Sequence, residues 1–394
     1  MEKGLNMKNT AIIINTGFDD GGSTTLGLEY HKLGLDVYFR NYMNPSMYRS
    51  QYKPTEKYKT YDIESDLLNI AKNYNRLIFG HLSTHYTNIN CYKILSEIKK
   101  TYPNLEICTL YCDRKYRTLK TLLPKLKETY NFEFDKFFTF IPGVKQDYPE
   151  KTELLDINAY SFPNTMFKEE RQNIILTSGR VEGYKGLLRY MSSFNDNMFI
   201  DGFNYIHQGA KISIKPNGSY VVTVQLLSLF DRTKKPMELI YPIAIKNYGE
   251  PPENNKLTIY PAYNRENITE WSNYFCSVSC ILGTKSRWED QQGKRNREQT
   301  LIKNTKSYWK YGIEYADIEK IAMGVPMLIS INYAELLGFT QKELIYNSFY
   351  DIPQLVQNLY KDKNLYKESY FKQLEFFKNR QIEVNNKIIK AFKE

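Results

Sequence analysis

Short apolar runs alternate with amphipathic segments along the chain, and this alternation predicts parallel β-strands connected by helices. In the first half, the runs predicted as strands lie at 11–14, 36–39, 76–80, 106–111 and 137–140. The segments predicted as helices lie at 26–33, 91–100 and 118–130. Because parallel strands need crossover connections, such a sheet carries helices on its faces. We therefore expect an α/β protein.

The same pattern restarts at Ile174, after a polar connector at 167–173. Apolar or strand-like runs follow at 174–176, 197–200, 236–245, 257–260, 275–282 and 326–331, with a helix at 313–323 and a long amphipathic tail at 368–393. The repetition predicts two Rossmann-like domains facing a central cleft, with ligands at the carboxyl ends of both sheets. We expect an N-terminal domain at 1–168, a C-terminal domain at 169–355, and a helical tail at 356–394 that packs back toward the N-terminal domain.

An anion-binding segment is predicted directly after the strand at 174–176. Its sequence is Ser178-Gly179-Arg180-Val181-Glu182-Gly183-Tyr184-Lys185-Gly186. Glycines let the backbone approach a ligand, and the N–H groups at the start of a helix point toward it. The helix dipole disfavours cations at that end, so Arg180 and Lys185 favour an anion between them, although both can also be ordinary surface side chains. We expect Gly179, Arg180 and Lys185 to hold a diphosphate.

A second segment, far along the chain, carries Glu314 and Glu319 on the helix predicted at 313–323. Carboxylates accept hydrogen bonds from the hydroxyl groups of a sugar or a ribose. The alternative is that both residues lie on the solvated face of the helix. Glu319 adjoins the apolar Ile318 and Ile321, so we expect it to be at least partly buried and to need hydrogen-bonding partners. Together the two segments indicate a site for a nucleotide sugar.

The first half of the chain offers two further candidate positions. Gly21, Gly22 and Ser23 follow the first strand and can bring backbone N–H groups to a phosphate or an acceptor. A glycine-rich turn alone is equally compatible with a structural role. Asp113 follows the strand at 106–111, where active-site carboxylates of α/β proteins often lie, but it also suits the N-cap of the next helix. The sequence leaves both interpretations open.

The net charge of +10, from 54 basic and 44 acidic side chains, favours a polyanionic partner. The competing explanation is the coding bias of an AT-rich genome, which enriches lysine. Four basic residues close to Asp113 are candidates for phosphate contacts, or simply an exposed helix face: Arg114, Lys115, Arg117 and Lys120.

Compartment and metal content are also predicted. No apolar run approaches the roughly 18 residues that span a bilayer, and the polar start at 1–9 does not resemble a signal peptide. Five cysteines, an odd number, favour reduced thiols, so we expect a cytoplasmic protein. The histidines lack metal-ligand spacing and the chain has no Asp-x-Asp, so no metal site is expected.

The Arg180/Lys185 and Glu314/Glu319 pairs resemble the donor site of retaining GT-B glycosyltransferases. Within that superfamily, the chain resembles the DNA α-glucosyltransferases of T-even phages. The resemblance extends over about 12–326 and rests on the order and spacing of four features. These are the glycine-rich turn at Gly21–Ser23, the strand that ends before Asp113, the Arg-x4-Lys-Gly segment and the Glu-Tyr-x3-Glu segment.

This resemblance implies a GT-B fold and a UDP-glucose donor, with no metal strictly required. It places Arg180 and Lys185 on the diphosphate, Glu319 on the ribose and Glu314 near the donor sugar. Asp113 would lie beside the acceptor hydroxyl, as base or orienter. The implied acceptor is the hydroxymethyl group of a modified pyrimidine in double-stranded DNA. The implied protein is a monomeric bacteriophage enzyme in the cytoplasm of a bacterial host, without a membrane partner.

Two other functions remain as alternatives. A bacterial GT-B glycosyltransferase acting on a cell-wall polysaccharide or a lipid carrier would use the same donor motifs. No clearly amphipathic membrane-docking helix is evident in the first half of the chain, which disfavours that function. A non-catalytic DNA-binding protein on a GT-B scaffold would explain the charge. The presence of all four donor residues disfavours it.

Overall fold

The chain forms two compact units, Met1–Tyr160 with Lys310–Tyr315 and Asn379–Glu394, and Ser161–Trp309 with Ala316–Lys378. The domain ranges 1–168, 169–355 and 356–394 stay predictions. The structure, a computed structural model, describes residues 10–14, 22–41, 58–62, 65–80, 89–111, 117–157, 167–178, 190, 196–210, 212–214, 220–222, 243–246, 250–261, 274–284 and 315–393.

The first unit is built on a parallel sheet. Its strands within the described residues are β1 (Thr10–Ile14), β2 (Asp36–Arg40), β3 (Lys59–Tyr61), β4 (Arg76–Gly80), β5 (Glu106–Tyr111), β6 (Lys136–Thr139) and β7 (Thr152–Leu154). They are ordered β3-β2-β1-β4-β5-β6-β7, and every neighbouring pair is parallel. The chain moves outward from β1 in one direction and then restarts at β4 on its other side. This reversal is the switch point at which open α/β sheets bind ligands.

Helices cover both faces of this sheet. They are α1 (Gly22–Lys32), α2 (Asp66–Ala71), α3 (Ile89–Thr101), α4 (Arg117–Tyr130), α5 (Pro142–Asp147) and the end of α12 (Lys363–Lys393). Side chains alternate between the faces of a strand, so Ala11 and Ile13 of β1 pack with α2, α3 and α4. Ile12 and Ile14 pack on the opposite face with α1 and α12.

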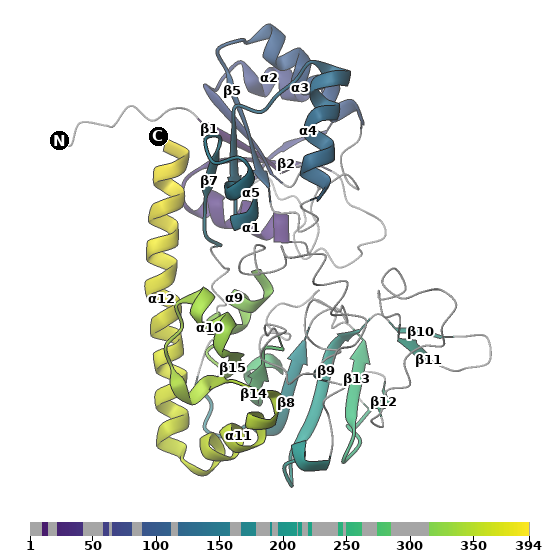
Figure 1. Cartoon of the computed structure of the whole chain (residues 1–394), viewed down its shortest axis with the longest axis vertical. Helices are drawn as coiled ribbons and strands as arrows, with labels where there is room; N and C mark the ends of the chain where they lie inside the picture. Colours follow the sequence, from purple (N-terminus) through teal and green to yellow (C-terminus); the bar gives the residue numbers. More distant parts are fainter. Residues whose placement is uncertain are drawn as a thin grey trace, which may run out of the picture. The chain divides into compact units, whose positions relative to one another are not determined.

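The second unit repeats this plan. Its strands within the described residues are β8 (Gln172–Ser178), β9 (Asn204–Ala210), β12 (Ile243–Ile245), β13 (Leu257–Pro261), β14 (Val278–Leu282), β15 (Met327–Ser330) and β16 (Ile345–Tyr346). They form a parallel sheet in the order β12-β13-β9-β8-β14-β15-β16, in which β8, β9 and β13 lie side by side (Figure 1). The order reverses between β8 and β14. A separate antiparallel pair is formed by β10 (Ile212–Ile214) and β11 (Tyr220–Val222).

Helices on the β14 side of this sheet are tied to its strands. They are α9 (Tyr315–Ala322), α10 (Ile331–Leu337), α11 (Ile352–Lys361) and the first part of α12, with short 3₁₀ turns η6 (Lys342–Leu344) and η7 (Phe349–Asp351). A further 3₁₀ turn, η2 (Asp196–Met198), precedes β9. Gln373 of α12 is fully buried and accepts from the backbone N–H of Met327 at 2.9 Å. Its amide donates to the carbonyls of Ile321 and Val325 at 3.2 and 2.8 Å. One side chain therefore fixes the connection between α9 and β15.

Gly324 ends α9 in the left-handed region, at φ +74°. A Cβ atom on this residue would also lie 2.7 Å from the ring of Tyr370 on α12. Glycine is therefore required here both for the backbone conformation and for the close approach of α12.

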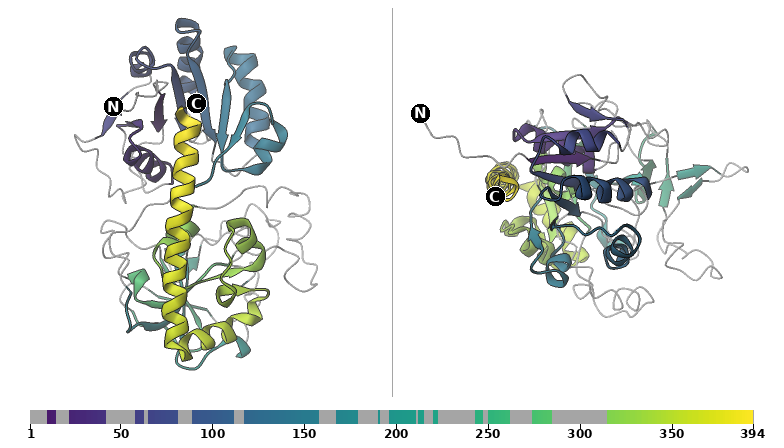
Figure 2. Two further views of the ribbon diagram at one scale, coloured as in Figure 1. Left: turned by 90° about the vertical axis from the view of Figure 1, so that its left-hand side faces the viewer. Right: turned by 90° about the horizontal axis from the view of Figure 1, so that it is seen from above.

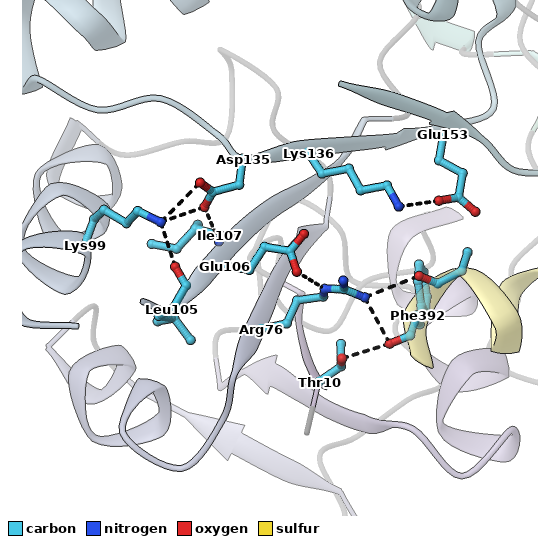
Figure 3. A network of polar contacts seen from close by, with 11 residues as sticks. Thr10, Arg76, Lys99, Leu105, Glu106, Ile107, Asp135, Lys136, Glu153 and Phe392 are labelled. Atoms are coloured by element: carbon cyan, nitrogen blue, oxygen red, sulfur yellow. Dashed lines mark hydrogen bonds and ion pairs between the residues drawn. The ribbon is translucent and has the colours of Figure 1, made fainter. Parts of the chain in front are cut away.

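The helix α12 is one uninterrupted element (Figure 2) that belongs to the second unit up to Lys378 and to the first from Asn379. Its last turn packs in the first unit, where the Phe392 ring meets Tyr30 and Phe138 edge-on. The hydroxyl of Thr10 donates to the Phe392 carbonyl at 2.9 Å (Figure 3). The predicted α/β class with two parallel sheets is confirmed, as is the packing of the C-terminal helix on the N-terminal unit.

One element was predicted wrongly, one is described only in part, and several short strands were not predicted. Residues 197–200 were predicted as strand-like, but Asp196–Met198 form a 3₁₀ turn, and the strand is β9, at Asn204–Ala210. The predicted run at 236–245 is described only at its end, where β12 lies. The short edge strands β3, β7 and β16 were not predicted, because two or three residues carry no readable periodicity.

Candidate functional site

The candidate site of the second unit lies at the carboxyl ends of β8 and β14, where the strand order reverses. Open α/β sheets bind ligands in the crevice outside this point. Ser178 is the last residue of β8 and pairs with Gln208 of β9. The predicted diphosphate segment Gly179–Gly186 begins at the next residue. Its own structure lies outside the described residues, as do Arg180 and Lys185.

Helix α9 reaches this strand end directly. Lys320 Nζ donates a hydrogen bond to the Ser178 carbonyl at 3.4 Å, across 142 positions of sequence. Lys320 lies next to Glu319, the predicted ribose ligand. The structure therefore brings the start of the diphosphate segment and the glutamate-bearing helix to one place, as expected for a shared ligand.

Glu319 is buried, with 6% of its surface exposed, which confirms the expected burial. Its neighbours Ile318 and Ile321 are fully enclosed. Its role as a ribose ligand stays a prediction. Glu314 precedes the first described residue of α9 and lies outside the described residues.

A polar network accompanies Glu319 on α9, and sequence reasoning missed it. Asp317 is 4% exposed, and its Oδ1 lies 3.4 Å from Lys320 Nζ. The hydroxyl of Tyr333, on α10, donates to Asp317 Oδ2 at 2.6 Å. The available signal was the Asp-x-x-Lys spacing, which places opposite charges on one helix face.

His207 lies on β9, beside β8. It is 1% exposed, and its Nδ1 lies 3.0 Å from the hydroxyl oxygen of Thr177. That hydroxyl donates its proton to the Ile206 carbonyl at 3.2 Å. The imidazole ring of His207 is therefore enclosed within the second unit.

The corresponding switch point of the first unit lies between β1 and β4. Gly22 and Ser23 occupy the first turn of α1, the next described element after β1, while Gly21 lies outside the described residues. At the end of β4, a Cβ atom on Gly80 would lie 2.9 Å from the Ile14 side chain, so glycine permits the close approach of the two strand ends. In open α/β sheets, ligands bind beside the carboxyl ends of the strands at such a switch point, here β1 and β4.

The predicted acceptor and DNA residues fall around β5 and α4. Asp113, Arg114 and Lys115 follow the end of β5 and lie outside the described residues. Arg117 and Lys120 belong to α4, in its first two turns. Their functional roles stay predictions.

Two further features concern only the described residues. Among them, no three His, Cys, Asp or Glu side chains are grouped so that they could hold a metal ion. None of their helices combines the length and apolarity needed to cross a membrane.

Solved structures share this architecture. An alpha-glucosyltransferase in complex with UDP and a 13-mer DNA containing an HMU base is similar with a TM-score of 0.63 at 12% identity, over 96% of this chain and 99% of that chain. An alpha-glucosyltransferase in complex with UDP-glucose and DNA containing an abasic site has a TM-score of 0.61 at 13% identity, over 96% and 99%. A T4 phage BGT in complex with UDP and Mn²⁺ has a TM-score of 0.55 at 14% identity, over 98% and 100%.

No family model and no curated protein matches the chain in sequence. The structural likenesses extend over nearly the whole chain and show its fold, the GT-B fold of glucosyltransferases solved in complex with UDP or UDP-glucose and DNA. The resemblance read from the sequence is thereby confirmed at the level of fold.

Proposed function

We propose that the protein transfers glucose from UDP-glucose to the hydroxymethyl group of a modified pyrimidine in double-stranded DNA, with retention at the anomeric carbon. The observation that carries the proposal is the contact between Lys320 and the Ser178 carbonyl. It joins the helix of Glu319 to the strand from which the Arg180 and Lys185 segment departs. The likeness in fold to glucosyltransferases crystallised with UDP and DNA supports the same function.

The donor side needs charge more than covalent help. Breaking the bond between the glucosyl C1 and the phosphate oxygen leaves negative charge on UDP. Arg180, Lys185 and the helix N–H groups after β8 stabilise that charge as it develops. Glu319 accepts from the ribose hydroxyls, and Glu314 contacts the sugar. Arg180 and Lys185 fill the role that a divalent metal plays in other glycosyltransferases. Transfer is therefore expected to proceed in the presence of a chelator.

The acceptor side receives the DNA. The hydroxymethyl oxygen attacks C1 from the face that the phosphate leaves, and its proton passes to Asp113 or to the departing phosphate oxygen. Arg114, Lys115, Arg117 and Lys120 hold the phosphates of the DNA backbone. A base stacked in a duplex must be reached in its groove or extruded, which costs a few kcal/mol.

The test uses UDP-[¹⁴C]glucose with plain, hydroxymethylcytosine and hydroxymethyluracil DNA, with label counted in precipitated polymer. Label that enters only hydroxymethylated DNA supports the proposal, and the base that is labelled identifies the acceptor. Turnover of UDP-glucose without labelled DNA would indicate another acceptor. DNA binding without any turnover would indicate a binding protein. Digestion of the labelled DNA with α- and β-specific glucosidases then decides between retention and inversion.

A further inference from the structure

The buried charges of α9 lie beside the end of β8, where the candidate donor site begins. Lys320 and Asp317 are 8% and 4% exposed and face each other within the same helix. Asp317 is held from the other side by Tyr333, which is 1% exposed and fixed in α10. The ammonium group is thereby aimed from a rigid position.

A buried ion pair of this kind contributes little net stability to a folded protein. Removing two charges from water carries a desolvation cost that their mutual attraction often fails to exceed, and apolar replacements of similar volume often fold as well or better. An i,i+3 pair on an exposed helix face would avoid that cost. The position of Lys320 therefore calls for a reason beyond its partner Asp317.

The ammonium group of Lys320 has a second contact, the hydrogen bond to the carbonyl of Ser178. Ser178 is the last residue of β8 and pairs with Gln208 at the end of the β8–β9 ladder. The Lys320 hydrogen bond holds the carbonyl at this point. It also links the end of β8 to α9, and with it to Glu319, the neighbour of Lys320.

We propose that Lys320 is a positioning residue for the donor site: anchored by Asp317 and Tyr333, it holds the end of β8 against α9 so that the diphosphate segment and Glu319 meet one UDP. The inference rests on the proposed function. It assigns Lys320 no contact with the reacting atoms. Asp317 and Tyr333 act through Lys320.

The test measures UDP binding by isothermal titration calorimetry on the full chain. Lys320→Met removes the ammonium but keeps the carboxylate of Asp317 buried. The double variant Asp317→Asn/Lys320→Met removes both charges and retains the acceptor for Tyr333. We expect the double variant to keep a Tm close to that of the unaltered protein, yet to bind UDP about tenfold more weakly or worse, as for a lost charged hydrogen bond. DNA affinity should not change.

A matched control separates geometry from general loosening. Val356 on α11 is 2% exposed and belongs to the same unit. Val356→Ala lowers Tm by leaving a cavity and should leave UDP affinity intact. A double variant that binds UDP as tightly as the unaltered protein overturns the inference alone. If Val356→Ala loses as much UDP affinity as the double variant, the inference is overturned as well. Failure of the unaltered protein to bind UDP ends the proposed function and the inference together.

Discussion

The guanidinium of Arg76 donates a hydrogen bond to the carbonyl oxygen of Phe392, 316 positions further along the chain, at 3.3 Å. The same Nη1 lies 3.4 Å from the Ala391 carbonyl, and Nε lies 2.5 Å from Glu106 Oε2 (Figure 3). The last carbonyls of a helix have no partner within it and carry its negative dipole end. A buried side chain at the start of β4 therefore caps the last helix of the protein.

Arg76→Met should destabilise the first unit by about 3 kcal/mol, because two enclosed helix carbonyls lose their charged donor. The measurement is urea unfolding followed by circular dichroism. Lys387→Met, on the exposed side of the same helix, is the control and should stay within about 0.5 kcal/mol. An Arg76→Met protein as stable as this control would show that the cap contributes nothing.

Cys108 and Cys280 should resist alkylation in the folded protein. Burial raises the pKa of the Cys280 thiol to about 12 and that of Cys108 further still, so almost no thiolate forms near neutral pH. Iodoacetamide labelling followed by peptide mass spectrometry should find both cysteines unmodified in buffer and fully modified in urea. Label on Cys280 in the folded protein at about pH 8 would contradict this enclosure.

The long buried strands were predictable because their apolar runs are continuous. β5 has the bounds that its pattern indicates, Glu106–Tyr111, and β4 has those of the run at 76–80. The strand β9, Asn204–Ala210, was not predicted, because Gly202, His207 and Gly209 interrupt or flank its apolar residues. The position of β9 between β8 and β13 could not be predicted from the sequence either, because strand pairing depends on contacts between residues distant in sequence.

The sequence indicated that the end of β8 and the helix α9 serve one site, but not the contact that joins them. Residue types and spacing indicated a ligand between the segments at 178–186 and 314–319. The contact that brings them together is made by Lys320, a residue that looks like any helix-surface lysine in the sequence. Only the fold shows that its ammonium group is buried and turned toward β8, because burial depends on the packing of α9 against the sheet.

Glu319→Gln should remove discrimination for the ribose. If Glu319 accepts from the ribose hydroxyls, the unaltered protein should bind UDP about tenfold or more tightly than 2′-deoxy-UDP, and the variant should bind both alike. Glutamine keeps the shape of the side chain, so the 6% exposed site should still fold. Calorimetric titration with the two nucleotides gives the comparison. Equal affinities for both nucleotides in the unaltered protein would assign Glu319 another role.

Lys185→Ala should abolish measurable binding of UDP-glucose while leaving DNA affinity unchanged, because the side chain is assigned to the diphosphate and not to the acceptor. Nucleotide binding is followed by calorimetry and DNA binding by fluorescence anisotropy. An Arg180→Ala variant should behave in the same way, since the two cations share one anion. A parallel loss of both affinities in Lys185→Ala would place this residue at the DNA instead.

DNA affinity should fall steeply with salt, and the basic residues of α4 should contribute unequally to that fall. Each phosphate neutralised adds about 0.9 to the slope of log K against log[salt]. Lys120→Met should therefore reduce the slope by about 0.9 if Lys120 holds a phosphate. Lys127, later on the same helix, already pairs with Glu133 at 2.6 Å, and this hydrogen bond raises the pKa of the Lys127 ammonium.

Lys127→Met is therefore the matched control and should leave the slope unchanged. Both slopes come from anisotropy titrations of a hydroxymethylated duplex over a range of NaCl concentrations. A flat salt response of the unaltered protein would remove DNA phosphates as its partner. A slope that falls equally in both variants would show that α4 acts through its total charge, and would contradict a specific contact at Lys120.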